Sequence, residues 1–169
     1  MCRSASPAAA SNHAPGRKAD AGARSAATRV KQGRSEELAV TPRATGSQSF
    51  HDQVIAERAK AWSLEPGFLK VHTNPGQEKN ASYTVDGEQV YPDLIIEHRD
   101  HGWFIEEVET EDSVNERELQ QWLKFARLGR PLNLIVPVTS ESTARRLIGD
   151  ARGVWVRTYT VVGRTVQFN

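Results

Sequence analysis

The segment YPDLIIEHRDHGWFIEEVET, at residues 91–110, decides the fold of this chain. Its two apolar runs, rich in β-branched and aromatic residues, predict strands over 90–96 and 103–110. The polar residues 97–102 between them predict a hairpin loop of about four to six residues. Because the first run is apolar on both faces, we expect the hairpin to lie in the centre of a sheet rather than at its edge.

Carboxylates are unexpected in runs this apolar. Asp93 opens the first expected strand, and Glu107 and Glu109 lie within the second. Residues i and i+2 of a strand point to the same face, so we expect Glu107 and Glu109 to project side by side, with Asp93 approaching from the neighbouring strand. Carboxylates that converge on one point repel each other unless a positive charge lies between them. A hard divalent cation with oxygen ligands, Mg²⁺ or Mn²⁺, is the usual answer.

Other interpretations of these acids stay open. Asp93 could be a turn residue bonded to local backbone, and Glu107 and Glu109 could face solvent on a half-buried strand. Glu106 points to the opposite face. It is either the salt-bridge partner of a Lys or Arg on a helix, or the true metal ligand if the register slips by one residue.

Charge is unevenly distributed along the chain. The 169 residues carry a net charge of +1, but residues 1–47 hold eight Lys or Arg and three Asp or Glu, and residues 48–169 hold fourteen and eighteen. A basic segment on a mildly acidic domain fits weak attraction to a polyanion, whereas the acidity of the domain argues against nucleic-acid binding by bulk charge alone. The single cysteine, Cys2, excludes a disulfide framework and a cysteine zinc site, so a reducing, cytoplasmic setting is expected. No apolar run approaches the roughly 18 residues that span a bilayer, so no membrane association is expected.

Composition divides the chain near residue 47. Residues 1–47, rich in Ala, Ser, Arg, Gly and Pro, predict a disordered tail, with a targeting peptide or an over-called start codon as alternatives. Residues 48–169 are long enough for one domain with its own core. Besides the hairpin, the expected elements are helices over 50–62, 114–128 and 140–148, strands over 68–73, 132–136, 154–162 and 165–168, and a candidate short strand over 82–85. Strand–helix–strand at 132–162 demands a crossover. The expected fold is therefore α/β, a central mixed β-sheet flanked by helices.

Element order and chemistry together resemble the PD-(D/E)XK nuclease superfamily, whose restriction-endonuclease-like core is an α-β-β-β-α-β unit. Pro92-Asp93 matches the first part of its motif. Glu107-Val108-Glu109 matches the second, with Glu109 where the family usually has lysine. The resemblance covers roughly residues 50–137. It implies a nuclease domain that hydrolyses phosphodiester bonds of nucleic acid with Mg²⁺ or Mn²⁺. DNA is the expected substrate, and RNA stays open as the alternative.

The resemblance also implies roles for the motif residues. Asp93 and Glu107 would bind the metal ion directly, and the Val108 carbonyl could be a third ligand. Glu109 would act as a general base or as a ligand to a second ion.

Further residues match positions that the superfamily often uses. An acid on the first helix has its match in Glu57, and a polar residue on the helix after the motif has its match in Gln121 or Gln120. Each of these is also an ordinary choice for a solvated helix face. A catalytic lysine could arrive from Lys70 on the first expected strand or from Lys124 on the helix after the motif, where it would orient the attacking water.

The missing motif lysine also favours an alternative, a catalytically inactive module of the same fold that binds nucleic acid or a protein partner. A carboxylate-pair hydrolase acting on glycosides is disfavoured, because Glu107 and Glu109 on one strand would lie on the same side of the substrate. A small domain with few extra loops lacks an evident element for reading sequence. We therefore expect cleavage of low specificity, or help from a homodimer partner or another protein.

Some aromatic and basic residues stand out in the sequence but are not assigned a catalytic role. Four tryptophans lie within expected elements and are expected in the core: Trp62, Trp103, Trp122 and Trp155. His98 and His101 are expected to be exposed in the hairpin loop. Arg145, Arg146 and Arg152 form a basic group near a helix end, which either lies on a solvated face or contacts phosphates.

Overall fold

The computed structural model of the protein describes residues 45–169. The tail expected over 1–47 lies outside the described residues, apart from 45–47. The elements follow the chain in this order: α1 Thr45–Ser63, β1 Phe68–Thr73, β2 Tyr83–Val85, β3 Glu88–Val90, β4 Leu94–His98, β5 Gly102–Val108, α2 Glu116–Ala126, β6 Leu132–Pro137, the 3₁₀ helix η1 Val138–Ser140, α3 Glu141–Ile148, β7 Val154–Val162 and β8 Thr165–Phe168.

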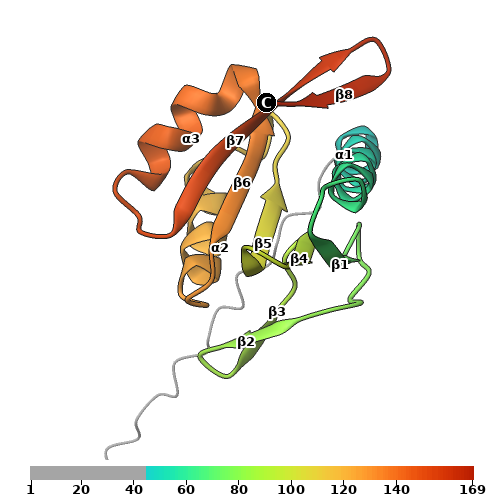
Figure 1. Ribbon diagram of the computed structural model, residues 1–169. Coiled ribbons are helices and arrows are strands. Elements are labelled where there is room, and N and C mark those ends of the chain that lie inside the picture. Colours follow the sequence, from blue (N-terminus) through green and yellow to red (C-terminus); the bar gives the residue numbers. More distant parts are fainter. Residues whose placement is uncertain (1–44) are drawn as a thin grey trace, which may run out of the picture. The chain divides into compact units, whose positions relative to one another are not determined.

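Six strands form one mixed sheet in the order β1-β4-β5-β6-β7-β8, and β2 pairs with β3 in a separate ribbon. The β1–β4, β4–β5 and β7–β8 pairs are antiparallel, whereas β5–β6 and β6–β7 are parallel and are joined by helical crossovers. Helix α1 covers one face of the sheet, and α2 and α3 cover the other (Figure 1). The predicted α/β class is confirmed, and the predicted helix–strand order is present with the β2–β3 ribbon inserted.

The core consists of two hydrophobic clusters, one on each face of the sheet. Ile95 and Ile105 pack in the cluster that contains Trp122 of α2. Ile96 packs in the other cluster, with Val54 of α1. Neighbouring residues of β4 thus enter opposite clusters, as the two-residue period of a strand requires. The hairpin is central in the sheet, as its apolar sequence indicates.

The first strand of the hairpin differs from its prediction at both of its ends. The first strand was expected over 90–96, but β4 begins at Leu94 and continues to His98, while Val90 belongs to the β2–β3 ribbon. The polar residues at the end of β4 stay in the ladder because β1 pairs with them, Lys70 opposite Glu97. A loop predicted from polarity alone therefore begins too early, because residues 97 and 98 belong to β4.

His98 is buried, and its expected exposure is wrong. Its side chain is 5% exposed, its Nε2 donates to Pro66 O at 2.8 Å, and its Nδ1 accepts from Asp100 N at 3.1 Å. Gly67 makes this packing possible, because a Cβ there would lie 2.6 Å from His98 Cε1. His101, in the turn itself, is exposed as expected.

The helices and remaining strands agree closely with expectation, with α1 extended to begin at Thr45. Helix α2 begins after Asn115, whose Oδ1 accepts from Arg117 N at 2.9 Å and from Glu118 N at 3.3 Å. This N-cap satisfies two amides that the helix itself leaves unpaired. Among residues 45–169, none of the helices is both long and apolar enough to cross a bilayer.

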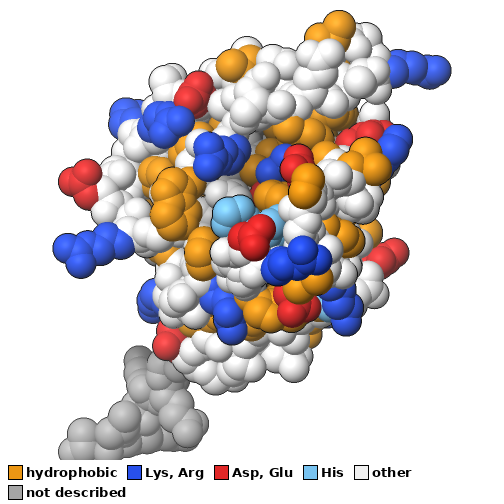
Figure 2. All heavy atoms as spheres, viewed as in Figure 1, with side chains coloured by type: hydrophobic (Ala, Val, Ile, Leu, Met, Phe, Trp, Pro, Cys, Tyr) orange, Lys and Arg blue, Asp and Glu red, His pale blue; other side chains and the backbone are white. Residues whose placement is uncertain are grey.

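The tryptophans do not all lie in the core. Trp122 is fully buried, and Trp62 and Trp103 pack half-buried against the two clusters. Trp155 is 47% exposed, so its predicted core position is wrong. It lies on β7 two residues from the exposed Arg157, on the strand face opposite the buried Val156. In Figure 2, Lys and Arg side chains flank exposed hydrophobic atoms over α3 and β7.

Candidate functional site

The β4–β5 register places Asp93 beside Glu107. Because Leu94 pairs with Glu106, the residue before β4 lies next to the end of β5. Asp93 Oδ2 accepts from Val108 N at 2.8 Å, and Asp93 N donates to Glu107 Oε2 at 3.2 Å. Asp93 is 7% exposed and Glu107 is 3% exposed. The structure thus brings these two acids together across the hairpin, each bonded to backbone of the opposite strand.

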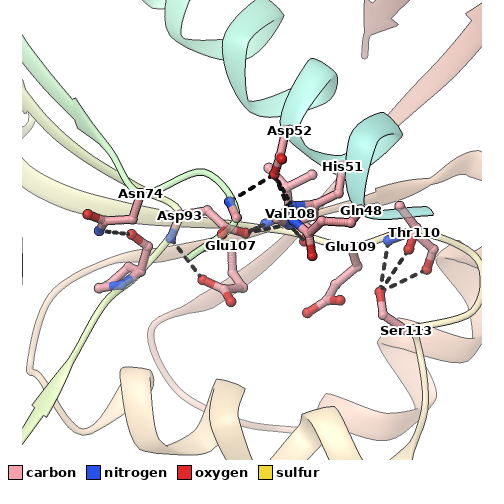
Figure 3. A network of polar contacts seen from close by, with 12 residues as sticks. Gln48, His51, Asp52, Asn74, Asp93, Glu107, Val108, Glu109, Thr110 and Ser113 are labelled. Carbon is pink, nitrogen blue, oxygen red and sulfur yellow. Dashed lines mark hydrogen bonds and ion pairs between the residues drawn. The ribbon is translucent and has the colours of Figure 1, made fainter. Parts of the chain in front are cut away.

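His51 of α1 reaches the same point from above the sheet (Figure 3). Its Nε2 lies 3.1 Å from Asp93 Oδ2 and 3.0 Å from Val108 O. A backbone carbonyl only accepts, so Nε2 must carry the ring hydrogen in this arrangement. The side chain of His51 is 2% exposed, and its ring closes the end of the hairpin against α1.

Gln48 and Asp52 flank the other ring nitrogen of His51, and Gln48 Nε2, 3.4 Å from Nδ1, can donate to it when Nε2 carries the hydrogen. Asp52 Oδ1 lies 3.3 Å from His51 Nδ1 and accepts from Gln48 Nε2 at 2.7 Å and from Gly76 N at 2.9 Å. Gly76 has φ of +59°, a backbone conformation that glycine adopts without strain. With its side chain 34% exposed, Asp52 marks the side on which the site approaches solvent.

The two glutamates of the motif point toward α2. Gln121 Nε2 donates to Glu107 Oε1 at 2.6 Å, and Trp122 Nε1 donates to Glu109 Oε1 at 2.6 Å. Consecutive residues of α2 therefore hold Glu107 in β5 and Glu109 just after that strand. Glu109 is fully buried, and its carbonyl accepts from Tyr159 Oη at 3.0 Å. Its carboxylate belongs to the interior between β5 and α2 rather than to an open cleft.

Hydroxyl groups close the turn between β5 and α2. Ser113 Oγ accepts from Thr110 N at 2.8 Å and donates to Thr110 O at 3.1 Å. Ser47 Oγ, in the first turn of α1, donates to Asp112 Oδ1 at 2.9 Å. These bonds fix the start of α1 over the end of β5, and so they position the His51 ring.

Glu106 points away from this site into the α1 face of the sheet. Arg58 Nε and Nη2 each donate to its carboxylate at 2.8 Å, and Trp62 Nε1 and Asn133 Nδ2 donate at 3.0 and 3.2 Å. Of the two interpretations offered for Glu106, the salt bridge to a helix cation is confirmed. A hollow of about 240 Å³, lined by Arg58, Asn133 and Arg157 among others, also lies on this face, away from Asp93 and Glu107.

Other residues that the sequence singled out lie elsewhere. Glu57 follows His51 by six positions, about 240° around the helix, so it faces a different direction. Lys70 is exposed and pairs with Glu97, toward the opposite end of β4 from Asp93. Lys124 forms an ion pair with Glu88 on the β2–β3 ribbon. The structure brings none of these three to the end of β5, although it does bring Gln121 there.

The donor atoms suit a hard cation in chemical type. Asp93 Oδ2 and the Val108 carbonyl are oxygen donors of the kind that Mg²⁺ and Mn²⁺ prefer, and both approach the same neighbour, His51 Nε2. Glu107 would need a side-chain rotation to join them, since its oxygens contact Gln121 and Asp93 N. Within residues 45–169, no three His, Cys, Asp or Glu side chains form a ready metal-binding group.

His51 is not among the residues singled out from the sequence, and its partners Asp93 and Val108 lie 42 and 57 residues further along the chain. One feature of the sequence does point to His51. His51 precedes the buried Val54 and Ile55 by three and four positions, so it lies on the apolar stripe of its helix. A histidine on a stripe that faces a carboxylate cluster is a candidate partner for that cluster.

Comparison with known proteins identifies one distant structural neighbour. No family model and no curated protein sequence matches the chain. Among solved structures, it is similar to Pyrococcus furiosus SfsA in complex with Ca²⁺, with 14% identity and a TM-score of 0.39. The alignment covers 72% of this chain and 61% of that chain. At such identity and TM-score the likeness says nothing about the chemistry of this chain.

Proposed function

We propose that the protein is a metal-dependent nuclease of the PD-(D/E)XK type that hydrolyses phosphodiester bonds in nucleic acid, DNA rather than RNA. One observation carries the proposal: Asp93 and Glu107 are bonded across the end of the β4–β5 hairpin, where Asp93 Oδ2 and Val108 O both lie within 3.1 Å of His51 Nε2. The 3% exposure of Glu107 and 7% exposure of Asp93 also support it, because a carboxylate removed from water is stabilised by a nearby positive charge.

Each residue has a defined part in this proposal. Asp93 and Glu107 hold Mg²⁺ or Mn²⁺ with the Val108 carbonyl, and Gln121 orients Glu107. A bound ion of this kind lowers the pKa of a coordinated water and neutralises charge that develops on the phosphate. Because the carboxylates are nearly buried, substrate would approach from the half-exposed Asp52 side.

Glu109 receives a positioning role rather than that of general base. A general base must reach the proton that it removes, directly or through one water. Glu109 is fully buried and is bonded to Trp122 Nε1 at 2.6 Å. In the proposed site it therefore holds α2, and with it Gln121, against β5.

A second candidate is a catalytically inactive module of the same fold that binds nucleic acid or a protein. The placement of the lysines favours it, since Lys124 pairs with Glu88 and Lys70 lies toward the far end of β4. Neither supplies the ammonium that would normally orient the attacking water.

Cleavage and metal binding separate the two candidates. The wild-type protein is incubated with plasmid DNA, and separately with RNA, in Mg²⁺ or Mn²⁺, and Mn²⁺ binding is titrated by calorimetry. Asp93→Asn and Glu107→Gln should each reduce DNA cleavage by at least roughly 100-fold, because a metal ligand is lost. Glu88→Gln, an exposed acid on the ribbon, is the matched control and should cleave like wild type.

Three outcomes are informative. Metal-dependent cleavage lost in the two site variants alone supports the nuclease. Nucleic-acid binding without Mn²⁺ binding or cleavage favours the inactive module. Equal cleavage by all four proteins would show that the activity does not come from this site.

A further inference from the structure

We infer that His51 is a ligand of the same divalent cation, oriented by Asp52, and that it makes the site select Mn²⁺ over Mg²⁺. The inference deepens the proposed function and depends on its cation site. The motif supplies only oxygen ligands, so a nitrogen ligand from α1 would change which ion the site prefers.

The distances around His51 match those of a coordination sphere. Adjacent ligands of an octahedral ion with bonds of about 2.1 Å lie about 3.0 Å apart. His51 Nε2 lies 3.1 Å from Asp93 Oδ2 and 3.0 Å from Val108 O, the two atoms that the motif assigns to the ion. His51 Nε2 therefore lies at the distance of a neighbouring ligand from each of these two oxygens.

A hydrogen bond has the same length, and the surroundings of Nδ1 decide between a simple helix-to-sheet bond and a ligand. Metal-binding histidines commonly donate the other ring N–H to a carboxylate, which fixes the tautomer and the ring orientation. Asp52 Oδ1 lies 3.3 Å from His51 Nδ1 and is itself held by Gln48 and by Gly76 N. In the tautomer of the structure Nδ1 can accept from Gln48 Nε2, at 3.4 Å, so the closer carboxylate of Asp52 becomes its partner only when Nδ1 carries the hydrogen, as in a metal-bound ring.

The arrangement also offers an acceptor for the hydrogen of the His51 ring when an ion binds Nε2. In the structure Nε2 carries it, because the Val108 carbonyl can only accept. Coordination requires the Nε2 lone pair, so the hydrogen must leave that atom. Asp52 Oδ1 then accepts the Nδ1 hydrogen of the metal-bound tautomer, which leaves the ring neutral and aligned toward Asp93.

The ion preference follows from the ligand types. Carboxylate and carbonyl oxygens suit Mg²⁺ and Mn²⁺ alike, whereas imidazole nitrogen suits first-row transition ions better than Mg²⁺. One nitrogen among oxygen ligands thus gives Mn²⁺ the advantage. Without His51, the remaining oxygen ligands should lose most of that discrimination.

The experiment measures Mn²⁺ and Mg²⁺ affinities of the full chain by calorimetry. In the wild type, Mn²⁺ should bind at least tenfold more tightly than Mg²⁺. His51→Gln should lower Mn²⁺ affinity by at least tenfold with a smaller effect on Mg²⁺, and Asp52→Asn should lower Mn²⁺ affinity by about 10-fold to 100-fold. His101→Gln, at the exposed histidine of the β4–β5 turn, is the matched control and should bind both ions like wild type.

A second readout does not depend on any variant. With Cd²⁺ as a diamagnetic probe, the ring ¹⁵N resonance of His51 Nε2 in the wild type should shift as a coordinated nitrogen does. Two results would overturn the assignment of His51 while leaving the oxygen-ligand nuclease intact: an unchanged Mn²⁺ affinity in His51→Gln, or a His51 Nε2 resonance that does not shift when Cd²⁺ is added. A wild type that binds neither ion would overturn both. Mn²⁺-selective binding without cleavage would uphold His51 as a ligand and refute only the nuclease.

Discussion

The buried ion pair between Arg58 and Glu106 offers the sharpest test of how this fold is held together. Arg58→Met retains a side chain of similar length but removes both guanidinium bonds to Glu106. The carboxylate, which is fully buried, then keeps only the neutral donors Trp62 Nε1 and Asn133 Nδ2. Breaking a buried pair in this way leaves an uncompensated charge, and we expect the protein to lose stability.

The size of the loss follows from burial. Removing one partner of a buried pair costs about 3–5 kcal/mol. The Arg58 side chain is 17% exposed, so water can reach the vacated space and the lower end, about 3 kcal/mol, is expected. For a domain of this size, that free energy corresponds to a fall in Tm of roughly 10–15 °C.

Urea unfolding followed by far-ultraviolet circular dichroism measures the change directly. Arg58→Met combined with Glu106→Gln should recover most of the loss, because the charge that needed the guanidinium is gone. Arg145→Met is the matched control. Its i,i+4 pair with Glu141 is exposed, so its removal should cost less than about 0.5 kcal/mol. If Arg58→Met unfolds within 1 kcal/mol (roughly) of wild type, or if the double variant is no better than the single one, the buried-pair reasoning is refuted.

Three further outcomes are expected. Gly67→Ala should destabilise the protein by about 2 kcal/mol in urea unfolding, because Gly67 has φ of +89° and an added Cβ would lie 2.6 Å from His98 Cε1; an unchanged midpoint would contradict the close packing. The hydrogen bond and charge of Lys124 lower the pKa of Glu88. The contribution of this pair to stability is therefore present above the ordinary glutamate pKa and is lost as pH falls through the lowered pKa. Carboxyl NMR titration should show the pKa of Glu88 rising in Lys124→Ala, and identical titrations of the two proteins would refute the pairing. Asn115→Ala should cost about 1 kcal/mol of stability through loss of the α2 cap, and Asn115→Asp should restore it.

The elements of the fold were predictable because their signals are local. The continuous apolar run 94–96 predicts a strand buried on both faces, as β4 is. Asp93 and Glu107 were predictable as neighbours because a hairpin brings nearby residues together. Even here the boundaries moved, since the pairing of Lys70 with Glu97 keeps β4 extended through residues that look like a turn.

The contacts of the site were not predictable in this way, because they join residues far apart in the chain. His51 meets Asp93 and Val108 across separations of 42 and 57 residues, and Arg58 meets Glu106 across 48. The rotation of α1 on the sheet decides which of its polar residues faces which carboxylate, and packing of Val54 and Ile55 sets that rotation. Periodicity shows that α1 has an apolar face but carries no information about what that face meets.

By itself, the sequence determined that two short apolar strands bear acids on a central hairpin, that helices flank the sheet, and that an acidic pair meets at one end. These features follow from periods of two and 3.6 residues, which are properties of the local backbone. Only the tertiary structure decided that Glu106 is neutralised by Arg58, that Glu109 is enclosed by Trp122, and that a histidine lies against Asp93. Those outcomes depend on how α1 and α2 pack on opposite faces of one sheet, and packing is a property of the whole chain.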